Sequence, residues 1–448
     1  MNRPEARPQL ARQLGLFGTT MAVMGGIIGA GIFINPWLVA QRVQTSELIL
    51  AAWIVGGLIA LAGGFIYAEL AERLPVVGGQ YAYLREALHP AVAFVYGWVL
   101  LLVIQTGGIA AVAVTFAHYL LELTQWPVSS SALAVGALAL LTVVNCLGVR
   151  AGSRVQSIMT LTAIGAIGLL EIVSFSQPGA QATAPARADA GPLPLAFGAA
   201  MTPVLFAYGG WQTTSFLGGE IRDADRVLPR ALILGVLGVV AVYVSVNFAY
   251  LHTLGPAGLA ATSTPASSVM RDSLGGRGPQ IIAAGIAFSA FGFLAQSMLT
   301  APRVYFAMAK DGVFFRAVAR VHPRTHAPVI AISLQGVWAI LIALSGTYGQ
   351  VVNYVVAMDA IFFGLTAICL FVLRRRGGSS RFRVPGHPWT TLLFIAAQWL
   401  IVISTFANDP RRAFIGLGFA LLGLPVYAIW KSKLALEPAR PRAGGTEH

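Results

Sequence analysis

Two glycine-rich motifs and one carboxylate could bind a small charged molecule inside apolar surroundings. The first motif, GGIIGAGIF at residues 25–33, places four glycines in an apolar stretch at 14–39. The second, FAYGGW at 206–211, places paired glycines among aromatic residues. Asp359 lies in a further apolar stretch, at 349–373. Free backbone N–H groups can hold an anion, free carbonyls can hold a cation, and a buried carboxyl can hold a cation or a proton.

The first glycine cluster predicts a helix that breaks partway along its length. Each glycine lowers helix propensity by about 0.8–1 kcal/mol relative to alanine, so four of them within 25–33 are costly in a continuous helix. Irregular backbone at the depth of a membrane must line a cavity, because lipid cannot satisfy its polar groups. Broken helices of this kind bind small charged solutes in many secondary transporters.

The composition indicates an integral membrane protein. Of 448 residues, 56% are hydrophobic and only 10% are charged, and the mean hydropathy is +0.73. A soluble protein of this size carries about 25% charged residues. Apolar stretches of roughly 20 residues, enough to cross a bilayer as a helix, recur about twelve times. They lie at 14–39, 47–72, 89–121, 132–149, 154–175, 193–217, 229–253, 278–309, 327–346, 349–373, 388–407 and 411–430.

The two glycine motifs predict an inverted repeat. They lie in the first and sixth spans, five spans apart, and two units of five spans have opposite topology because five is odd. We therefore expect an all-α membrane protein with broken first and sixth helices and two further helices at the end. The predicted parts are a cytoplasmic segment at 1–13, one transporter domain at 14–431 with repeats at 14–175 and 193–373 and last helices at 388–430, and a cytoplasmic tail at 432–448.

The distribution of basic residues predicts the orientation. The net charge is +13, which in a soluble protein would suggest nucleic acid as a partner, but most of the 30 basic residues lie in alternate loops. Cytoplasmic loops of membrane proteins are enriched in Lys and Arg. We expect both termini in the cytoplasm, a location in the plasma (inner) membrane, and no nucleic acid partner.

Six motifs, in order, resemble one known family. They are GGIIGAGIF (25–33), YAELAERLPVVGGQYAYL (67–84), FAYGGW (206–211), EIRDADRVLPRA (220–231), PRVYFAMAKDG (302–312) and RVPGHP (383–388). Together they resemble the amino acid/polyamine/organocation superfamily, and within it the L-type amino acid transporter branch, from about residue 14 to 431. The resemblance implies a permease that moves amino acids across the membrane by alternating access.

The resemblance also implies a binding site for the substrate. In the family, N–H groups at the first break hold the substrate carboxylate, and carbonyls at both breaks hold its ammonium group. Many relatives have Ser at the position of Ala30, so a hydroxyl contact is missing here. The expected substrate-binding residues are Ile27, Gly29, Ala30, Gly31, Phe206, Ala207, Gly209 and Asp359, with Phe206 also acting as an aromatic gate.

Asp359 leaves the substrate class open. By the resemblance, its position faces the substrate and varies among relatives with substrate charge. We expect neutral amino acids; the alternative is a transporter of cationic amino acids or polyamines with Asp359 as the cation anchor. Asp359 could instead bridge to a gate, carry a coupling proton, or bond to neighbouring backbone. A membrane-embedded amino acid sensor would have the same site.

Gates and coupling ions are predicted less directly. Glu69 with Arg73, and Glu220 with Arg230, lie near cytoplasmic helix ends, where they either close an inner gate or anchor the helices at the interface. Ser297 matches a hydroxyl position near sodium in sodium-coupled relatives and is a candidate cation site. The coupling ion, proton or sodium, stays open; simple exchange or proton symport is preferred over sodium.

Other chemistry is not indicated. The chain has no HExxH, GxSxG or P-loop motif and no Cys/His cluster with metal spacing, so we expect no enzyme, no catalytic residue, no metal and no cofactor. Its two cysteines, Cys146 and Cys369, fall in predicted spans, and 122–131 lacks the cysteine by which relatives attach a glycoprotein subunit. We therefore expect no disulfide-linked partner; the expected partners are the amino acid substrate and the bilayer.

Overall fold

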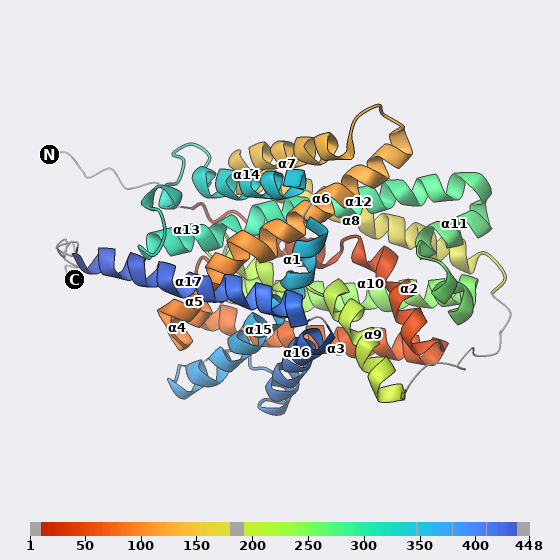
Figure 1. Cartoon of the computed structure of the whole chain (residues 1–448). Helices are drawn as coiled ribbons and strands as arrows, with labels where there is room; N and C mark the ends of the chain where they lie inside the picture. Colours follow the sequence, from red (N-terminus) through yellow and green to blue (C-terminus); the bar gives the residue numbers. More distant parts are fainter. Residues whose placement is uncertain (1–9, 180–191, 346–347, 379, 409, 437–448) are drawn as a thin grey trace.

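The protein is a bundle of helices, many of which are long enough to cross a membrane. The structure, a computed structural model, describes residues 10–179, 192–345, 348–378, 380–408 and 410–436 (Figure 1). In these residues eight helices are long and apolar enough to cross a membrane, and the bent pair of α1 and α2 makes nine. Helices α7 and α14 are shorter and apolar, and α15 has 28 residues. The predicted all-α membrane protein with about twelve spans is confirmed.

The spans follow the predicted order. The first repeat region contains α1 (Leu16–Ile27), α2 (Gly31–Val43), α3 (Ser46–Arg73), α5 (Pro90–Val99), the π-helical η1 (Leu100–Ile104), α6 (Gln105–Thr124), α7 (Ser130–Cys146) and α8 (Val149–Phe175). The second contains α9 (Leu193–Ala207), the 3₁₀ helix η2 (Trp211–Phe216), α10 (Ala224–Ala261), α12 (Gly278–Thr300), α13 (Pro302–Lys310), α14 (Val329–Ser345) and α15 (Tyr348–Arg375). The last two spans are α16 (Trp389–Asn408) and α17 (Pro410–Leu436).

Both predicted helix breaks are present. Helices α1 and α2 meet at an angle of 42°. Helix α9 ends at Ala207, and the chain continues as η2 after a turn with Gly210 at a φ of 108°. The four pieces cross in pairs, with α1 packed against η2 and α2 packed against α9. Each break therefore lies beside the other.

Two short helices were not predicted. Helices α4 (Gln80–Ala87) and α11 (Pro265–Leu274) lie at opposite ends of the bundle (Figure 1). Short 3₁₀ turns, η3 (Gly275–Arg277) and η4 (Arg316–Ala319), also lie in the connections. We call the end of the bundle that carries Leu14, Glu69, Glu220, Asp311 and Trp430 the terminal face, and the end that carries α11 the opposite end.

Candidate functional site

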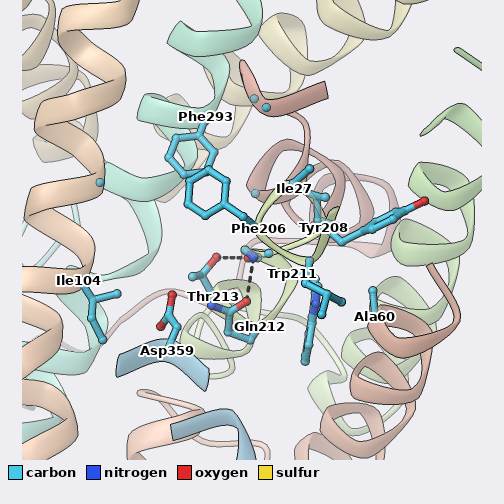
Figure 2. Close-up of a pocket in the computed structure, with 18 of the residues that line it drawn as sticks. Ile27, Ala60, Ile104, Phe206, Tyr208, Trp211, Gln212, Thr213, Phe293 and Asp359 are labelled. Carbon is cyan, nitrogen blue, oxygen red and sulfur yellow. Dashed lines mark hydrogen bonds between the residues drawn. The ribbon is translucent and has the colours of Figure 1, made fainter. Parts of the chain in front are cut away.

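A cavity of about 330 Å³ lies between the two helix breaks (Figure 2). Residues of α3, η1, α6, α12, α15 and α16 complete its wall. All eight residues predicted to bind substrate line this cavity, namely Ile27, Gly29, Ala30, Gly31, Phe206, Ala207, Gly209 and Asp359. Its volume is in the range of pockets that enclose small molecules, about 300–1,000 Å³.

The first break presents unused backbone donors to the cavity. Ile28, at the end of α1, has extended backbone, and α2 starts at Gly31. Within the described chain, the N–H groups of Gly29, Ala30 and Gly31 donate to no backbone or side-chain oxygen. Because a helix N-terminus also carries a partial positive charge, this group of donors suits an anion such as a carboxylate.

At the second break, side chains form hydrogen bonds with the backbone groups of Gly210. The N–H of Gly210 donates to Gln212 Oε1 at 3.0 Å, and Thr213 Oγ1 donates to the carbonyl of Gly210 at 2.7 Å. Gln296 Nε2, from α12, donates to Thr213 Oγ1 at 2.7 Å; Figure 2 shows Gln212 and Thr213 at this break. The sequence reasoning missed Gln212, Thr213 and Gln296; their polar side chains inside apolar spans were the available signal.

Glycine is required where the two breaks touch. A Cβ atom added to Gly210 would lie 1.8 Å from the carbonyl oxygen of Gly26. A Cβ added to Gly26 would lie 2.8 Å from the carbonyl oxygen of Gly210. Gly210 also has a positive φ that other residues rarely adopt. Gly26 and Gly210 therefore allow the backbones of the two broken helices to touch.

The carbonyls expected to hold an ammonium group differ in the hydrogen bonds that they already accept. Ile27 O accepts a hydrogen bond from Tyr243 OH at 3.0 Å, and Phe206 O accepts one from the N–H of Gly209 at 3.1 Å. The carbonyl of Gly209 has no hydrogen-bond donor in the described residues. Since a carbonyl has two lone pairs, Ile27 and Phe206 could each accept one further hydrogen bond, and Gly209 is the least committed acceptor.

Asp359 carries a carboxyl group into an otherwise uncharged cavity. Among the described residues that line the cavity it is the one charged side chain. It is half-buried, and Figure 2 shows it on the α15 side of the cavity, near Ile104 and Thr213 in this view. No ion pair of the described residues includes its carboxyl group. The same residues contain no group of three or more His, Cys, Asp or Glu side chains that could hold a metal ion.

Aromatic rings form another part of the wall. Phe206 is 48% exposed and lines the cavity, and its role as a gate stays a prediction. Phe293, from α12, packs against the first break, because a Cβ on Gly29 would lie 3.5 Å from its ring. Trp211 stacks on Phe363 with ring centroids 5.7 Å apart. Phe293 therefore limits the space beside Gly29, and the other rings form further parts of the wall.

The cavity is accessible toward the opposite end and closed toward the terminal face. Every residue from 21 to 29 is buried, whereas Ala30, Gly31 and Ile34 on α2 are partly exposed. The second break repeats this contrast, since η2 is fully buried while Thr202 on α9 is partly exposed. In both broken helices the residues that line the cavity from the half nearer the opposite end are the more exposed ones.

Glu69 joins three elements at the terminal face. Its carboxylate accepts two hydrogen bonds from Arg73, the shorter at 3.0 Å, two from Arg374, the shorter at 2.5 Å, and one from the N–H of Val384 at 2.9 Å. These contacts connect the end of α3 to the end of α15 and to the chain before α16. Glu69 does not line the cavity.

Glu220 forms a fully buried ion pair with Arg303. The Arg303 guanidinium donates from Nε to Oε2 at 2.6 Å and from Nη2 to Oε1 at 3.0 Å, and both side chains are 0% exposed. The expected pairing of Glu220 with Arg230 is wrong. Arg230 is exposed, and the Glu220 carboxylate pairs with Arg303 on α13 instead. The pair connects the segment after η2 to α13.

A third charged contact at the terminal face is more open to solvent. Asp311, after α13, pairs with Arg85 of α4 and accepts a hydrogen bond from Tyr81 OH at 2.9 Å. Burial and the nearby Asp311 carboxylate raise the pKa of Tyr81, so its hydroxyl stays protonated and donates. This contact joins the short helix α4 to α13.

Ser297, the candidate cation site, is buried at the cavity wall. Its hydroxyl has no hydrogen-bond partner in the described chain, while its carbonyl accepts from Gln335 Nε2 at 3.1 Å. A role in cation binding stays a prediction. Cys146 and Cys369 are both free thiols, and the absence of a disulfide-linked subunit also stays a prediction.

The chain is similar to known transport proteins over nearly its whole length. The profile of a family described as "Amino acid permease" matches residues 14–428. The Bacillus subtilis "Serine/threonine exchanger SteT" is 34% identical over 437 residues, which cover 95% of this chain and 98% of that protein. The human "Large neutral amino acids transporter small subunit 2" is 30% identical, with 95% and 82% covered. The mouse "Asc-type amino acid transporter 1" is 28% identical, with 95% and 83% covered.

Proposed function

Since this chain belongs to the amino acid permease family, we propose that it is a secondary transporter that exchanges small neutral amino acids by alternating access. The family assignment agrees with the resemblance inferred from the motifs. The observation that carries the proposal is the cavity at the two helix breaks, with the unused N–H groups of Gly29, Ala30 and Gly31 on its wall. These donors match the one group that all amino acids share beside their ammonium group, the carboxylate.

The two charges of an amino acid fit the two breaks. The carboxylate binds at the N-terminus of α2, where the helix dipole favours negative charge. The ammonium group donates to the carbonyl of Gly209 and to the remaining lone pairs on Ile27 and Phe206. The side chain then points toward Phe206, Phe293 and the apolar remainder of the cavity.

The substrate class follows from the cavity and from the relatives. A volume of about 330 Å³ suits a small solute, and most of the wall is Gly, Ala, Ile and Phe. The named relatives include an exchanger of serine and threonine and a transporter of large neutral amino acids. Both names describe substrates with no net side-chain charge, which supports neutral amino acids here.

Transport requires that access to the site change sides. We place the terminal face in the cytoplasm, because Arg73, Arg85 and most loops rich in basic residues lie there. The structure then corresponds to a state that is open to the outside. Return to the cytoplasm requires that the contacts of Glu69, Glu220 and Asp311 separate, so these carboxylates act as the inner gate.

The test is uptake by purified protein in liposomes. Vesicles loaded with unlabelled serine or with buffer are given labelled serine, with and without sodium and a pH gradient. Under the proposal, uptake depends on internal serine. External alanine, threonine and leucine compete with the labelled serine and lower its uptake. Uptake unaffected by all neutral amino acids would refute the proposal, and binding without flux would favour a sensor.

Asp359 supports a second candidate function, the transport of basic amino acids or polyamines. Its carboxyl group faces the cavity and has no counter-charge in the described wall. If it anchors a cationic side chain, Asp359→Asn lowers arginine uptake at least tenfold, about 1.4 kcal/mol, relative to alanine uptake. Thr115→Ser, which keeps the cavity uncharged at another wall position, is the matched control. Equal changes for both substrates would refute this second function.

A further inference from the structure

The segment that joins α15 to α16 displays arginines away from the protein. We call residues 380–388 the strap. Its residues alternate: the ring of Phe382 lies 6.0 Å from the ring of Phe65 and Val384 is 4% exposed, whereas Arg381 and Arg383 are exposed. Arg381 and Arg383 are therefore the residues of this stretch that face away from the protein, and Phe382 and Val384 face toward it.

The inner side of the strap is fixed to α3 through its backbone. Glu72 accepts hydrogen bonds from the N–H groups of Arg381 and Phe382, both at 2.7 Å, and Glu69 accepts one from Val384 at 2.9 Å. These carboxylates are thus engaged by backbone groups and by other side chains. In the described chain neither the Arg381 nor the Arg383 guanidinium has an ion-pair partner.

The strap leads directly into a helix whose apolar face is exposed. Trp389, the first residue of α16, is 73% exposed. Leu393 at 70%, Leu400 at 66% and Ile403 at 63% continue one face of the helix. Helix α16 also lies at the edge of the bundle in Figure 1. Tryptophan at the end of such a helix is typical of the level of the lipid headgroups.

We propose that Arg381 and Arg383 bind the phosphate of an anionic phospholipid whose acyl chains lie along the exposed face of α16. The guanidinium fork matches phosphate oxygens in geometry and charge. From Trp389 to Ile403 the helix rises about 21 Å, longer than the roughly 15 Å of one hydrocarbon leaflet. The strap precedes a span at the level of the headgroups, where the phosphates of the bilayer are the anions nearest to the two arginines.

The site is connected to the closed end of the transporter. Glu69 binds the strap at Val384 and also binds Arg374 and Arg73. A lipid held by Arg381 and Arg383 would therefore stabilise the segment that keeps α3 and α15 together at the terminal face.

The test measures lipid retention on the full-length protein by native mass spectrometry. The protein is purified in detergent micelles that contain phosphatidylglycerol and phosphatidylcholine. The double variant Arg381→Gln/Arg383→Gln is compared with wild type. Each basic residue near an anionic surface contributes about 1 kcal/mol, so losing both weakens phosphatidylglycerol retention by about thirty-fold. The matched control is Arg226→Gln/Arg230→Gln, two exposed arginines at the start of α10 on the same face.

Each outcome decides the proposal without a transport measurement. Selective loss of one phosphatidylglycerol from the strap variant, with melting in phosphatidylcholine unchanged, supports it. Equal loss in both double variants would show a general charge effect and overturn the site. Inorganic phosphate that displaces the lipid from wild type at millimolar concentration would overturn the choice of a lipid. Retention equal to wild type in the strap variant would overturn it outright.

Discussion

The two halves of the bundle, on either side of the helix breaks, differ in charge and in access. The half toward the opposite end has an accessible wall that includes Ala30 and Thr202. The half toward the terminal face is buried along 21–29 and along η2, and charged side chains join its ends. We propose that these ion pairs hold this half closed; the described residues of the other half form no ion pair. Under this proposal alternating access breaks the ion pairs, so substitutions in the two halves should have different effects.

The largest effect is expected where the halves meet. Gly210→Ala places a Cβ against the carbonyl of Gly26 and forces a non-glycine residue to a φ of 108°. Backbone overlap of this kind costs about 3 kcal/mol or more, so we expect loss of folded protein or of all transport. Gly165→Ala, whose Cβ would meet nothing within 4 Å, is the control. Both are measured by melting temperature and serine uptake; wild-type behaviour of Gly210→Ala would contradict the contact between the breaks.

The next effect is expected at the buried ion pair. Arg303→Ala leaves the Glu220 carboxylate buried without its partner and should lower the free energy of unfolding by about 3–5 kcal/mol. The double variant Glu220→Leu/Arg303→Met removes both charges and should recover most of this loss. Thermal unfolding of the three purified proteins gives the comparison. If the single and double variants melt together, the pair is not the reason for the stability of this end.

A smaller change should loosen the closed end without unfolding it. Arg374→Gln removes one of the two arginines from Glu69 but leaves Arg73 in place. We expect a loss of about 1–2 kcal/mol in the closure of the terminal face. Thr214→Cys, at a fully buried position of η2, should then react with a thiol reagent about five- to thirty-fold faster. An unchanged reaction rate would show that Glu69 does not hold the gate closed.

The smallest effect is expected at the open ion pair. Arg85→Gln removes the partner of Asp311, but both side chains are partly exposed, at 30% and 26%. Such pairs contribute about 0–1 kcal/mol, so melting temperature and uptake should change little. A fall in melting temperature as large as that of Arg303→Ala would mean that burial does not determine how much each ion pair contributes to stability.

The helix breaks and the cavity wall could be predicted because they depend on local sequence. Clustered glycines weaken a helix at any position in the fold, and the motifs at 25–33 and 206–211 lie where the structure breaks. Helices α4 and α11 gave no comparable signal, because short helices at an interface need no apolar run of about 20 residues.

The pairing of charged residues could not be predicted in the same way. Glu220 and Arg303 are 83 residues apart, and only the packing of α13 brings them together. Arg230 is nearer in sequence, yet it faces solvent. The side chains that satisfy the second break were missed for a similar reason, since Gln296 reaches Thr213 from another span.

The central claim is that an amino acid binds at the breaks from the opposite end, and the reaction of Ala30→Cys tests it most directly. In a chain without Cys146 and Cys369, a membrane-impermeant thiol reagent is added to intact cells with and without serine. Gly276→Cys, in η3, marks the opposite end, and Ala22→Cys, fully buried in α1, is the control. We predict that Ala30→Cys reacts from the same side as Gly276→Cys, that serine protects it, and that Ala22→Cys does not react. Reaction from the other side, or no protection by any neutral amino acid, would contradict the account.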